Sequence, residues 1–516
     1  MGYTTLVFFI FVAAVIFIYY LPVLRNYQWV ILLISSILFY AYTGVRFLIL
    51  ILISALFVYL GALLAEKTKT AVSTALIFIF GVLVFFKYEF YVLSFLADIF
   101  NPMLTGSPIR PLYIVMPLGI SFYTFQAAGY IIDVSREKIK AERNFFKVLL
   151  FLTFFPQITQ GPISFYSDLA HQLYGSRKFD YIKLKYGLEL VLWGYFKKCV
   201  IADRLAPVIS NVMSDYRGWS GTADAFVLMV YAIQLYADFS AGIDITRGIG
   251  EVMGIDLAEN FRRPYFSRSL SEYWRRWHIT LGAWMKNYIF FPIAVSGKSV
   301  RLRKMIRSTG FGKTEFGKHV SNTLSGCIAT LIVFLIVGMW HGASWRFVFF
   351  GFYNGILIAL SMLMEPVFIN VKKAFGIMEG SYLFRAFQYI RTLLLVLIGY
   401  VFDIAPSLRE GFDMIGRMIT GEDLLAFTDN EWIRVYGEEI SVKQAVFNYQ
   451  IIILSCMVLF FVSLCQERTG CILREKLGRM HFGIQWIGIV LLTLFILSFG
   501  AYGPGYDIRG FVYTKF

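Results

Sequence analysis

Charged residues are scarce in this chain: Asp, Glu, Lys and Arg make up 16% of its 516 residues, whereas a typical soluble domain has about 25%. Hydrophobic residues make up 58%, and the mean hydropathy is +0.65. This composition excludes an ordinary soluble domain. It predicts an all-α polytopic membrane protein, since helices satisfy their own backbone hydrogen bonds within lipid.

Cysteine is also sparse, with five residues scattered along the chain. None of them forms a Cys-x-x-Cys pair or a Cys/His cluster, so the spacing indicates neither a metal site nor a disulfide framework. We expect no metal and no bound cofactor. These cysteines are predicted to be small apolar residues in helices: Cys199, Cys327, Cys456, Cys465 and Cys471.

Twelve apolar stretches are candidates for membrane-spanning helices, which need roughly 20 residues each. The first has no positive charge before Arg25 and no small-residue cleavage pattern, so we expect it to be retained. No internal repeat or linker divides the chain, and we expect one membrane domain over residues 1–516. The twelve stretches are 4–22, 28–45, 47–65, 72–86, 146–160, 184–200, 224–237, 322–340, 345–364, 386–404, 449–465 and 484–502.

Alternation of these spans conflicts with the charge of one loop. If Arg25 lies inside, spans at both 88–100 and 113–133 would place the basic residues of 136–147 outside. The second stretch contains several polar residues, among them Gln126. Polar groups at membrane depth are tolerated where they are buried in protein or line a cavity. We predict a re-entrant or tilted element near 113–133, with a plain short span as the alternative.

The net charge is +15, and the charged residues are concentrated in the predicted loops between the spans. Between Lys298 and His319 seven Lys and Arg residues face one acid, Glu315, which predicts a cytoplasmic loop. The stretch 403–443 instead carries nine acids against four basic residues, and we expect an extracytoplasmic loop over 405–448. This distribution indicates membrane lipid, and not nucleic acid, as the partner of the basic charge.

One histidine follows a long apolar run: His341 comes after residues 331–340. An ionisable residue there is expensive and indicates a partner or a task. Neutral imidazole, with a pKa near 6.5, can take a proton from an alcohol that attacks a carbonyl. On a helix that continued past Gly342, Ser344 and Trp345 would lie close to it. The structural alternative is a histidine that only hydrogen-bonds a backbone carbonyl.

A second histidine, His278, lies among tryptophans and basic residues. This pattern predicts an amphipathic helix in the cytoplasmic headgroup zone, for which an interfacial anchor is the structural alternative. Arginines also bind phosphate bidentately, so the segment predicts a site for a phosphorylated acyl carrier such as a coenzyme. The arginines are Arg262, Arg263, Arg268, Arg275 and Arg276, and the tryptophans are Trp274, Trp277 and Trp284.

Several long motifs together resemble the membrane-bound O-acyltransferase family, and within it the bacterial branch that contains alginate O-acetylation proteins. The similarity covers most of residues 1–365. The motifs are Met116-Pro117-Leu118-Gly119-Ile120-Ser121-Phe122-Tyr123-Thr124-Phe125-Gln126, Phe155-Pro156-Gln157-Ile158-Thr159-Gln160-Gly161-Pro162-Ile163, Gln234-Leu235-Tyr236-Ala237-Asp238-Phe239-Ser240, Asn260-Phe261-Arg262-Arg263-Pro264-Tyr265, Trp274-Arg275-Arg276-Trp277-His278-Ile279-Thr280-Leu281 and Trp340-His341-Gly342.

The resemblance implies a helical bundle with a funnel or tunnel through a bacterial cytoplasmic membrane. It also implies that His341 is catalytic and that His278 is the second histidine, nearer the cytoplasm. The donor would be an acyl thioester inside the cell, such as acetyl-CoA, and the acceptor a hydroxyl group of an extracytoplasmic polysaccharide. We assign a further set of residues to the donor and substrate path: Arg275, Arg276, Trp277, Trp274, Asp238, Trp340, Ser344 and Gln126.

Two other functions compete with O-acetylation. Related proteins that pass D-alanine from a carrier protein toward teichoic acid share the fold and both histidines, but they usually carry Asn where this chain has Arg275, which favours O-acetylation. In a permease or export component, His341 would serve as a proton relay. An acetylation route would need a second, extracytoplasmic acyltransferase as partner, and the loop 405–448 is a candidate docking surface for it; a solvated connector is the alternative.

Overall fold

The computed structural model describes residues 1–101, 114–421, 431–437, 440–502 and 511. Within these ranges the chain is helical and contains no β-strand, which confirms the all-α prediction. The chain forms two compact units. Each unit is built from separate stretches of the chain, so they are not successive domains of the sequence.

Unit 1 comprises residues 1–203, 237–259 and 471–516, and unit 2 comprises residues 204–236 and 260–470. The helix α11 (Gly221–Val252) begins in unit 2 and ends in unit 1. The other helices of unit 1 are α1 (Leu6–Tyr19), η1 (Pro22–Tyr27), α2 (Gln28–Ala41), α3 (Val45–Ala65), α4 (Lys69–Phe100), α5 (Ile120–Ser135), α6 (Phe145–Thr153), α7 (Phe155–Ile158), α8 (Tyr166–Tyr174), α9 (Tyr181–Tyr195), η3 (Phe196–Ala202), α24 (Leu473–Gly478) and α25 (Phe482–Phe499).

Unit 2 contains both histidine segments. Its helices, besides the first part of α11, are α10 (Asp203–Ser214), η4 (Tyr216–Gly218), η5 (Pro264–Phe266), α12 (Leu270–Arg276), α13 (Ile279–Met285), η6 (Lys286–Phe290), α14 (Phe291–Ala294), α15 (Gly297–Ser308), α16 (Gly310–Lys313), α17 (Glu315–His341), α18 (Trp345–Leu363), α19 (Glu365–Ala374), α20 (Tyr382–Ile404), α21 (Leu408–Thr420), α22 (Glu431–Arg434) and α23 (Val442–Thr469).

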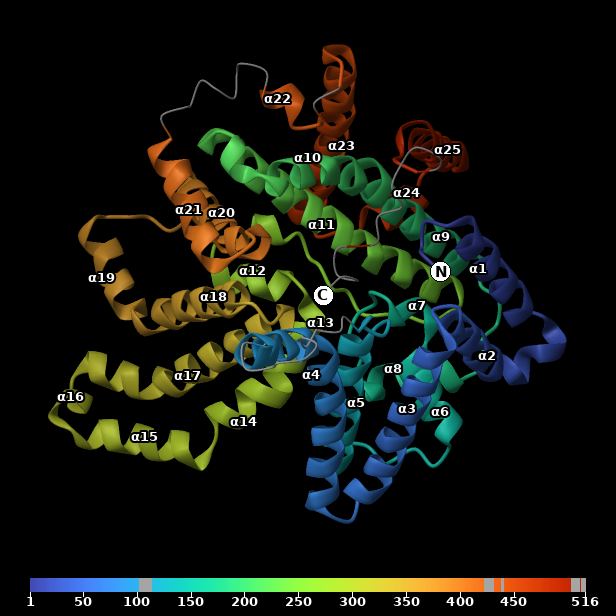
Figure 1. Ribbon diagram of the computed structural model, residues 1–516, viewed down its shortest axis with the longest axis horizontal. Coiled ribbons are helices and arrows are strands. Elements are labelled where there is room, and N and C mark those ends of the chain that lie inside the picture. The colour runs from blue at the N-terminus through green and yellow to red at the C-terminus, as the bar shows by residue number, and fades with distance from the viewer. Residues whose placement is uncertain (102–113, 422–430, 438–439, 503–510, 512–516) are drawn as a thin grey trace. The chain divides into compact units, whose positions relative to one another are not determined.

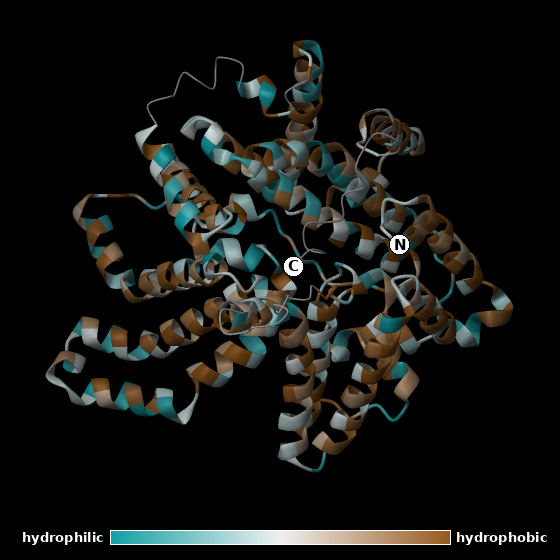
Figure 2. Cartoon of the chain, in the orientation of Figure 1, coloured by the Kyte–Doolittle hydropathy of each residue, from teal (hydrophilic) through white to brown (hydrophobic). Residues whose placement is uncertain are grey.

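Among the described residues, nine helical segments are long and apolar enough to cross a membrane: η1 with α2, then α3, α4, α11, α17, α18, α20, α23 and α25. Hydrophobic residues cover long stretches of these helices (Figure 2). Each of the nine overlaps a predicted span, so the chain is a multi-pass membrane protein as expected. The helix α1, predicted as 4–22, has 14 residues and is shorter than the nine.

One predicted span, 146–160, is wrong, and another, 184–200, is not among the nine segments. The stretch 146–160 breaks into α6 and α7 at Phe154, and Pro156 restarts the helix in the first turn of α7, where its missing N–H costs no hydrogen bond. The stretch 184–200 divides into α9 and the π-helix η3. Two buried lysines of η3 are paired with carboxylates of α11, so this segment faces protein and not lipid.

Residues 88–100 are not a separate element, because α4 continues through them without a break. The helix α5 begins after Gly119, whose φ of 70° lies in the left-handed region and whose missing side chain leaves room for the carbonyl oxygen of Ile158. Gln126 is buried on α5. Residue 113 lies outside the described residues, and the re-entrant element near 113–133 stays a prediction.

The helices α17 and α18 lie side by side, joined by a short turn (Figure 1). Glycines allow this contact: a Cβ atom on Gly338 would meet the Cα of Gly351 at 3.1 Å, and one on Gly351 would collide with the carbonyl oxygen of Phe334. Small residues let the backbones of membrane helices approach closely, and dispersion contacts then hold them together. This contact fixes the end of α17, where His341 lies.

We predict that Gly351→Ala destabilises unit 2 by about 1–3 kcal/mol, because the added methyl group must push two backbones apart. Gly326→Ala on α17 is the matched control, since its Cβ would meet the Cε of Met362 at 3.4 Å, an ordinary contact. Thermal unfolding of the purified protein should show a lower Tm for Gly351→Ala alone. Equal Tm values for the two variants would contradict the close approach.

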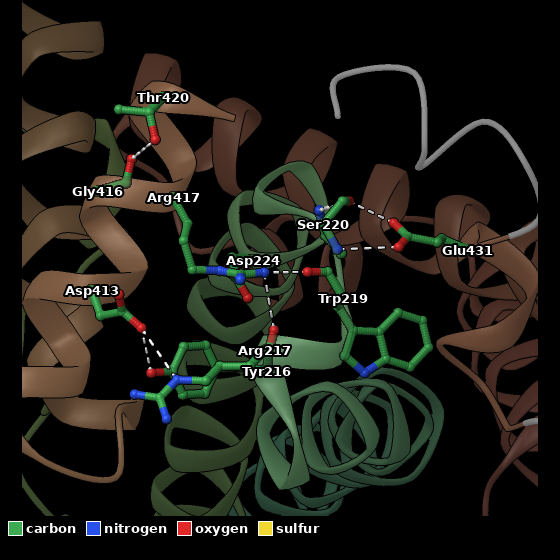
Figure 3. Close-up of polar contacts among 11 residues, drawn as sticks. Tyr216, Arg217, Trp219, Ser220, Asp224, Asp413, Gly416, Arg417, Thr420 and Glu431 are labelled. Atoms are coloured by element: carbon green, nitrogen blue, oxygen red, sulfur yellow. Dashed lines mark hydrogen bonds and ion pairs between the residues drawn. The ribbon is translucent and has the colours of Figure 1, made fainter. Parts of the chain in front are cut away.

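The expected extracytoplasmic loop 405–448 contains two helices, α21 and α22, and its residues 422–430 and 438–439 lie outside the described ones. Polar contacts tie both helices to the start of α11 (Figure 3). Arg417 of α21 donates to Asp224 at 3.1 Å and to the carbonyl oxygens of Tyr216 and Trp219. Glu431 of α22 accepts from both the backbone N–H, at 3.1 Å, and the hydroxyl of Ser220, at 2.6 Å.

Asp224 is fully buried, so its charge depends on Arg417. We predict that Arg417→Met destabilises the protein by about 3–5 kcal/mol, the cost of leaving a buried charge without its partner. Arg217→Met is the control, because the ion pair of Arg217 with Asp413 is exposed and such pairs contribute little. A Tm for Arg417→Met as high as that of the control would contradict this role.

Candidate active site

The motif around His278 is broken in two, and the predicted amphipathic headgroup helix is wrong. The helix α12 ends at Arg276, α13 begins at Ile279, and His278 between them has a left-handed φ of 49°. His278 and Trp277 are each 3% exposed, so both face the protein interior. A continuous amphipathic helix would have left this segment on the surface.

An antiparallel backbone contact holds the broken segment. The N–H of Arg262 donates to the carbonyl of Arg276 at 2.9 Å, and the N–H of Ile279 donates to the carbonyl of Asn260 at 3.0 Å. Phe261 and Trp277 form an isolated β-bridge between these two bonds. The backbone groups released where the helix breaks are thereby satisfied, which buried polar groups require.

His341 is the last residue of α17 and is buried. The predicted continuation of this helix is wrong: α18 starts at Trp345, which is 76% exposed, and Ser344 is the half-buried residue that precedes α18. The neighbours of the His341 ring are instead Phe347, at 6.1 Å between ring centroids, and Phe350, at 5.5 Å.

Trp340 brings the two histidines into one site. Its ring centroid lies 6.0 Å from that of His278 and 5.2 Å from that of His341. All three residues belong to unit 2 and all are buried. His278 and His341, which are 63 positions apart in the sequence, therefore contact the same indole ring and lie in one site.

Trp274, another predicted site residue, reaches the same region through Asn354. Its Nε1 donates to Asn354 Oδ1 at 3.0 Å, and Asn354 Nδ2 donates to the carbonyl of Phe350 at 2.9 Å. Phe350 also contacts His341. Sequence reasoning missed Asn354, although an amide within an apolar span was a signal that could have found it.

The arginines divide into two groups. Arg276 contacts Glu272 at 2.7 Å and Glu467 at 2.9 Å, and Arg263 contacts Glu467 at 2.7 Å. These two guanidinium groups are held by carboxylates of the protein. Arg262, Arg268 and Arg275 are exposed, and Arg275 donates to Ser271 Oγ at 2.9 Å.

The two remaining predicted site residues, Asp238 and Gln126, belong to unit 1. Asp238 is fully buried and accepts from Lys198 at 2.7 Å, and Lys198 also contacts Asp203 at 2.8 Å. Gln126 is buried, and its Nε2 has no hydrogen-bond partner among the described residues. Sequence reasoning missed the buried ion pair of Lys198, although this lysine lies within the predicted span 184–200.

Comparison with known proteins gives the family of the chain. The sequence profile of the membrane-bound O-acyltransferase family matches residues 134–310, a range that includes His278. A probable alginate O-acetylase of Pseudomonas syringae pv. tomato is 31% identical over 432 residues, which cover 80% of this chain and 74% of the relative. The chain belongs to the membrane-bound O-acyltransferase family.

Further relatives differ in the activities that their names state. A peptidoglycan O-acetyltransferase of Helicobacter pylori is 30% identical over 64% of this chain and 63% of its own length. A teichoic acid D-alanyltransferase of Streptococcus thermophilus is 26% identical over 53% of this chain and 64% of its own length. The protein is therefore an O-acyltransferase of a bacterial membrane, and the permease alternative is set aside.

Burial lowers the pKa of His278 to about 3, whereas an unfolded histidine titrates near 6.5. Between these two values the unfolded chain binds one more proton, so stability falls as the pH drops below about 6.5. We predict that this residue contributes a slope of at most about 1.4 kcal/mol per pH unit.

The measurement is the Tm of the purified protein between pH 7 and pH 5, compared with that of His278→Gln. The native Tm should fall more steeply than that of the variant. His171→Gln is the control, because His171 is exposed, and it should follow the native protein. Parallel curves for the native protein and His278→Gln would show that His278 is not buried in its neutral form.

Proposed function

We propose that this protein moves an acetyl group from a cytoplasmic thioester, such as acetyl-CoA, toward hydroxyl groups of an extracytoplasmic polysaccharide. The observation that carries the proposal is the pair of buried histidines that contact Trp340 within one unit. The relatives named as an alginate O-acetylase and a peptidoglycan O-acetyltransferase support acetyl as the transferred group and a glycan polymer as the acceptor.

In this proposal His341 is the catalytic base. Its imidazole takes the proton of the acceptor hydroxyl as the oxygen attacks the thioester carbonyl, and the proton then passes to the departing thiolate, so that an ester and a free thiol are formed. The aromatic neighbours of His341, Phe347 and Phe350, exclude water that would otherwise hydrolyse the thioester. His278, whose ring also contacts Trp340, helps to bind the acyl donor in this proposal.

The donor enters, in this proposal, from the side that bears the basic loop. Seven Lys and Arg residues between Lys298 and His319 give that side a positive potential. Arg262, Arg268 and Arg275 are exposed and offer guanidinium groups to the phosphates of a coenzyme. The ion pairs of Glu467 keep Arg263 and Arg276 in place as part of the scaffold.

A second, extracytoplasmic acyltransferase is the proposed recipient of the acetyl group. The helices α21 and α22 are fixed to the start of α11 by Arg417 and Glu431, which makes this part of the loop 405–448 a firm surface (Figure 3). A firm surface costs less ordering entropy when a partner binds than a mobile connector would. We propose it as the docking surface for that partner.

The test is mass spectrometry of ester-linked groups on surface polysaccharide and on teichoic acid, in cells that carry native or variant protein at matched expression. His341→Ala should lower polysaccharide-bound acetate by at least about 100-fold, the lower range for removal of a general base. His171→Ala is the matched control, since this exposed histidine lies on α8, and it should leave the acetate unchanged.

Loss of D-alanine from teichoic acid with His341→Ala would instead assign the D-alanyl activity. Unchanged esters of both kinds would contradict the proposal. Release of CoA from acetyl-CoA by the purified protein, absent in His341→Ala, gives a second readout that does not depend on the acceptor polymer.

A further inference from the structure

Asn260 lies beside His278 and is fully buried. Its side-chain oxygen, Oδ1, faces three groups: the backbone N–H of Thr280 at 3.0 Å, the Thr280 hydroxyl at 3.0 Å and His278 Nδ1 at 3.3 Å. None of the sequence motifs singled out this residue for a role in the site. Its contacts determine which nitrogen of His278 carries the hydrogen.

The orientation of the Asn260 amide follows from its neighbours. The backbone N–H of Thr280 can only donate, so the amide atom that faces it must be the oxygen. The Nδ2 atom on the other side has no hydrogen-bond partner among the described residues, so nothing there favours the reversed amide. A reversed amide would set two donors against each other in a buried place.

The tautomer of His278 follows in turn. A carboxamide oxygen has no hydrogen to give, so His278 Nδ1 must donate to it, and in a neutral imidazole the lone pair then lies on Nε2. We propose that Asn260 is a positioning residue that holds His278 in the Nδ1–H tautomer and makes Nε2 the atom that accepts a proton or a hydrogen bond during acyl transfer.

The backbone keeps Asn260 in register with His278. The bond from the N–H of Ile279 to the carbonyl of Asn260 and the bridge between Phe261 and Trp277 fix the two segments beside each other. An Asn at this place accepts from both Thr280 and His278, so the same oxygen closes the turn and orients the ring. The role of Nε2 in acyl transfer rests on the proposed function, whereas the tautomer itself does not.

The experiment is nitrogen NMR of the full-length protein in lipid, with histidine labelled with ¹⁵N at both ring positions. The chain has five histidines, and subtraction of the spectrum of His278→Gln assigns the signals of His278. The expected result is a protonated Nδ1 and an unprotonated Nε2 at neutral pH. Hydrogen on Nε2 in the native protein would overturn the proposal.

Variants of Asn260 and Thr280 distinguish an effect on the tautomer of His278 from an effect on folding. Asn260→Leu should remove the preference for the Nδ1–H tautomer and lower acyl transfer by about 10–100-fold, the usual cost of losing a group that orients a functional histidine. Asn260→Asp keeps an oxygen acceptor and should retain the native tautomer. Thr280→Val is the control, because it removes the hydroxyl but leaves both the backbone N–H and Asn260.

The native tautomer in Asn260→Leu would also overturn the proposal. If Asn260→Leu does not fold, the native spectrum and that of Asn260→Asp still decide the question. The NMR spectra report the tautomer of His278 even if the protein transfers no acetyl groups. A wrong proposed function can therefore be distinguished from a wrong assignment of the tautomer.

Discussion

The site depends on one constraint: the backbone groups that are released where a helix breaks inside this apolar protein must find hydrogen-bond partners. At His278 the helix breaks, which releases backbone donors and acceptors that would be costly to bury. Residues 260–262 accept and donate those bonds, and the left-handed φ of His278 directs the chain from α12 into α13. Without this antiparallel contact the motif would remain a surface helix, and its histidine would face the headgroups.

The second histidine is placed by the packing of two helices. Gly338 and Gly351 let α17 and α18 approach closely, and the turn between the helices places Phe347 and Phe350 against His341. Trp340 then contacts both histidine rings. An acyl-transfer site needs a base and an apolar wall that excludes water, and this arrangement supplies both from rigid helices.

The sequence was sufficient to predict the all-helical membrane fold, because long apolar runs leave few other structures possible within lipid. It also singled out both histidines of the candidate site: His341 because an ionisable group after an apolar run stands out, and His278 because tryptophans and arginines surround it. The break at His278 could not be predicted, because its cause, the contact with residues 260–262, is a tertiary one. The false span at 146–160 has a related origin: hydropathy does not distinguish burial in protein from exposure to lipid. Asn354 escaped notice, and Asn260 stood in a quoted motif without an assigned role, because the importance of both lies in what they contact.

The most direct test of this account is a cryo-EM structure of the protein with a non-hydrolysable acetyl thioester analogue of coenzyme A. The account predicts that the acetyl group lies beside Trp340 and next to the rings of His278 and His341, with the coenzyme phosphates near Arg262, Arg268 or Arg275. An analogue bound with its carbonyl remote from both histidines would contradict the claim that they form the acyl-transfer site.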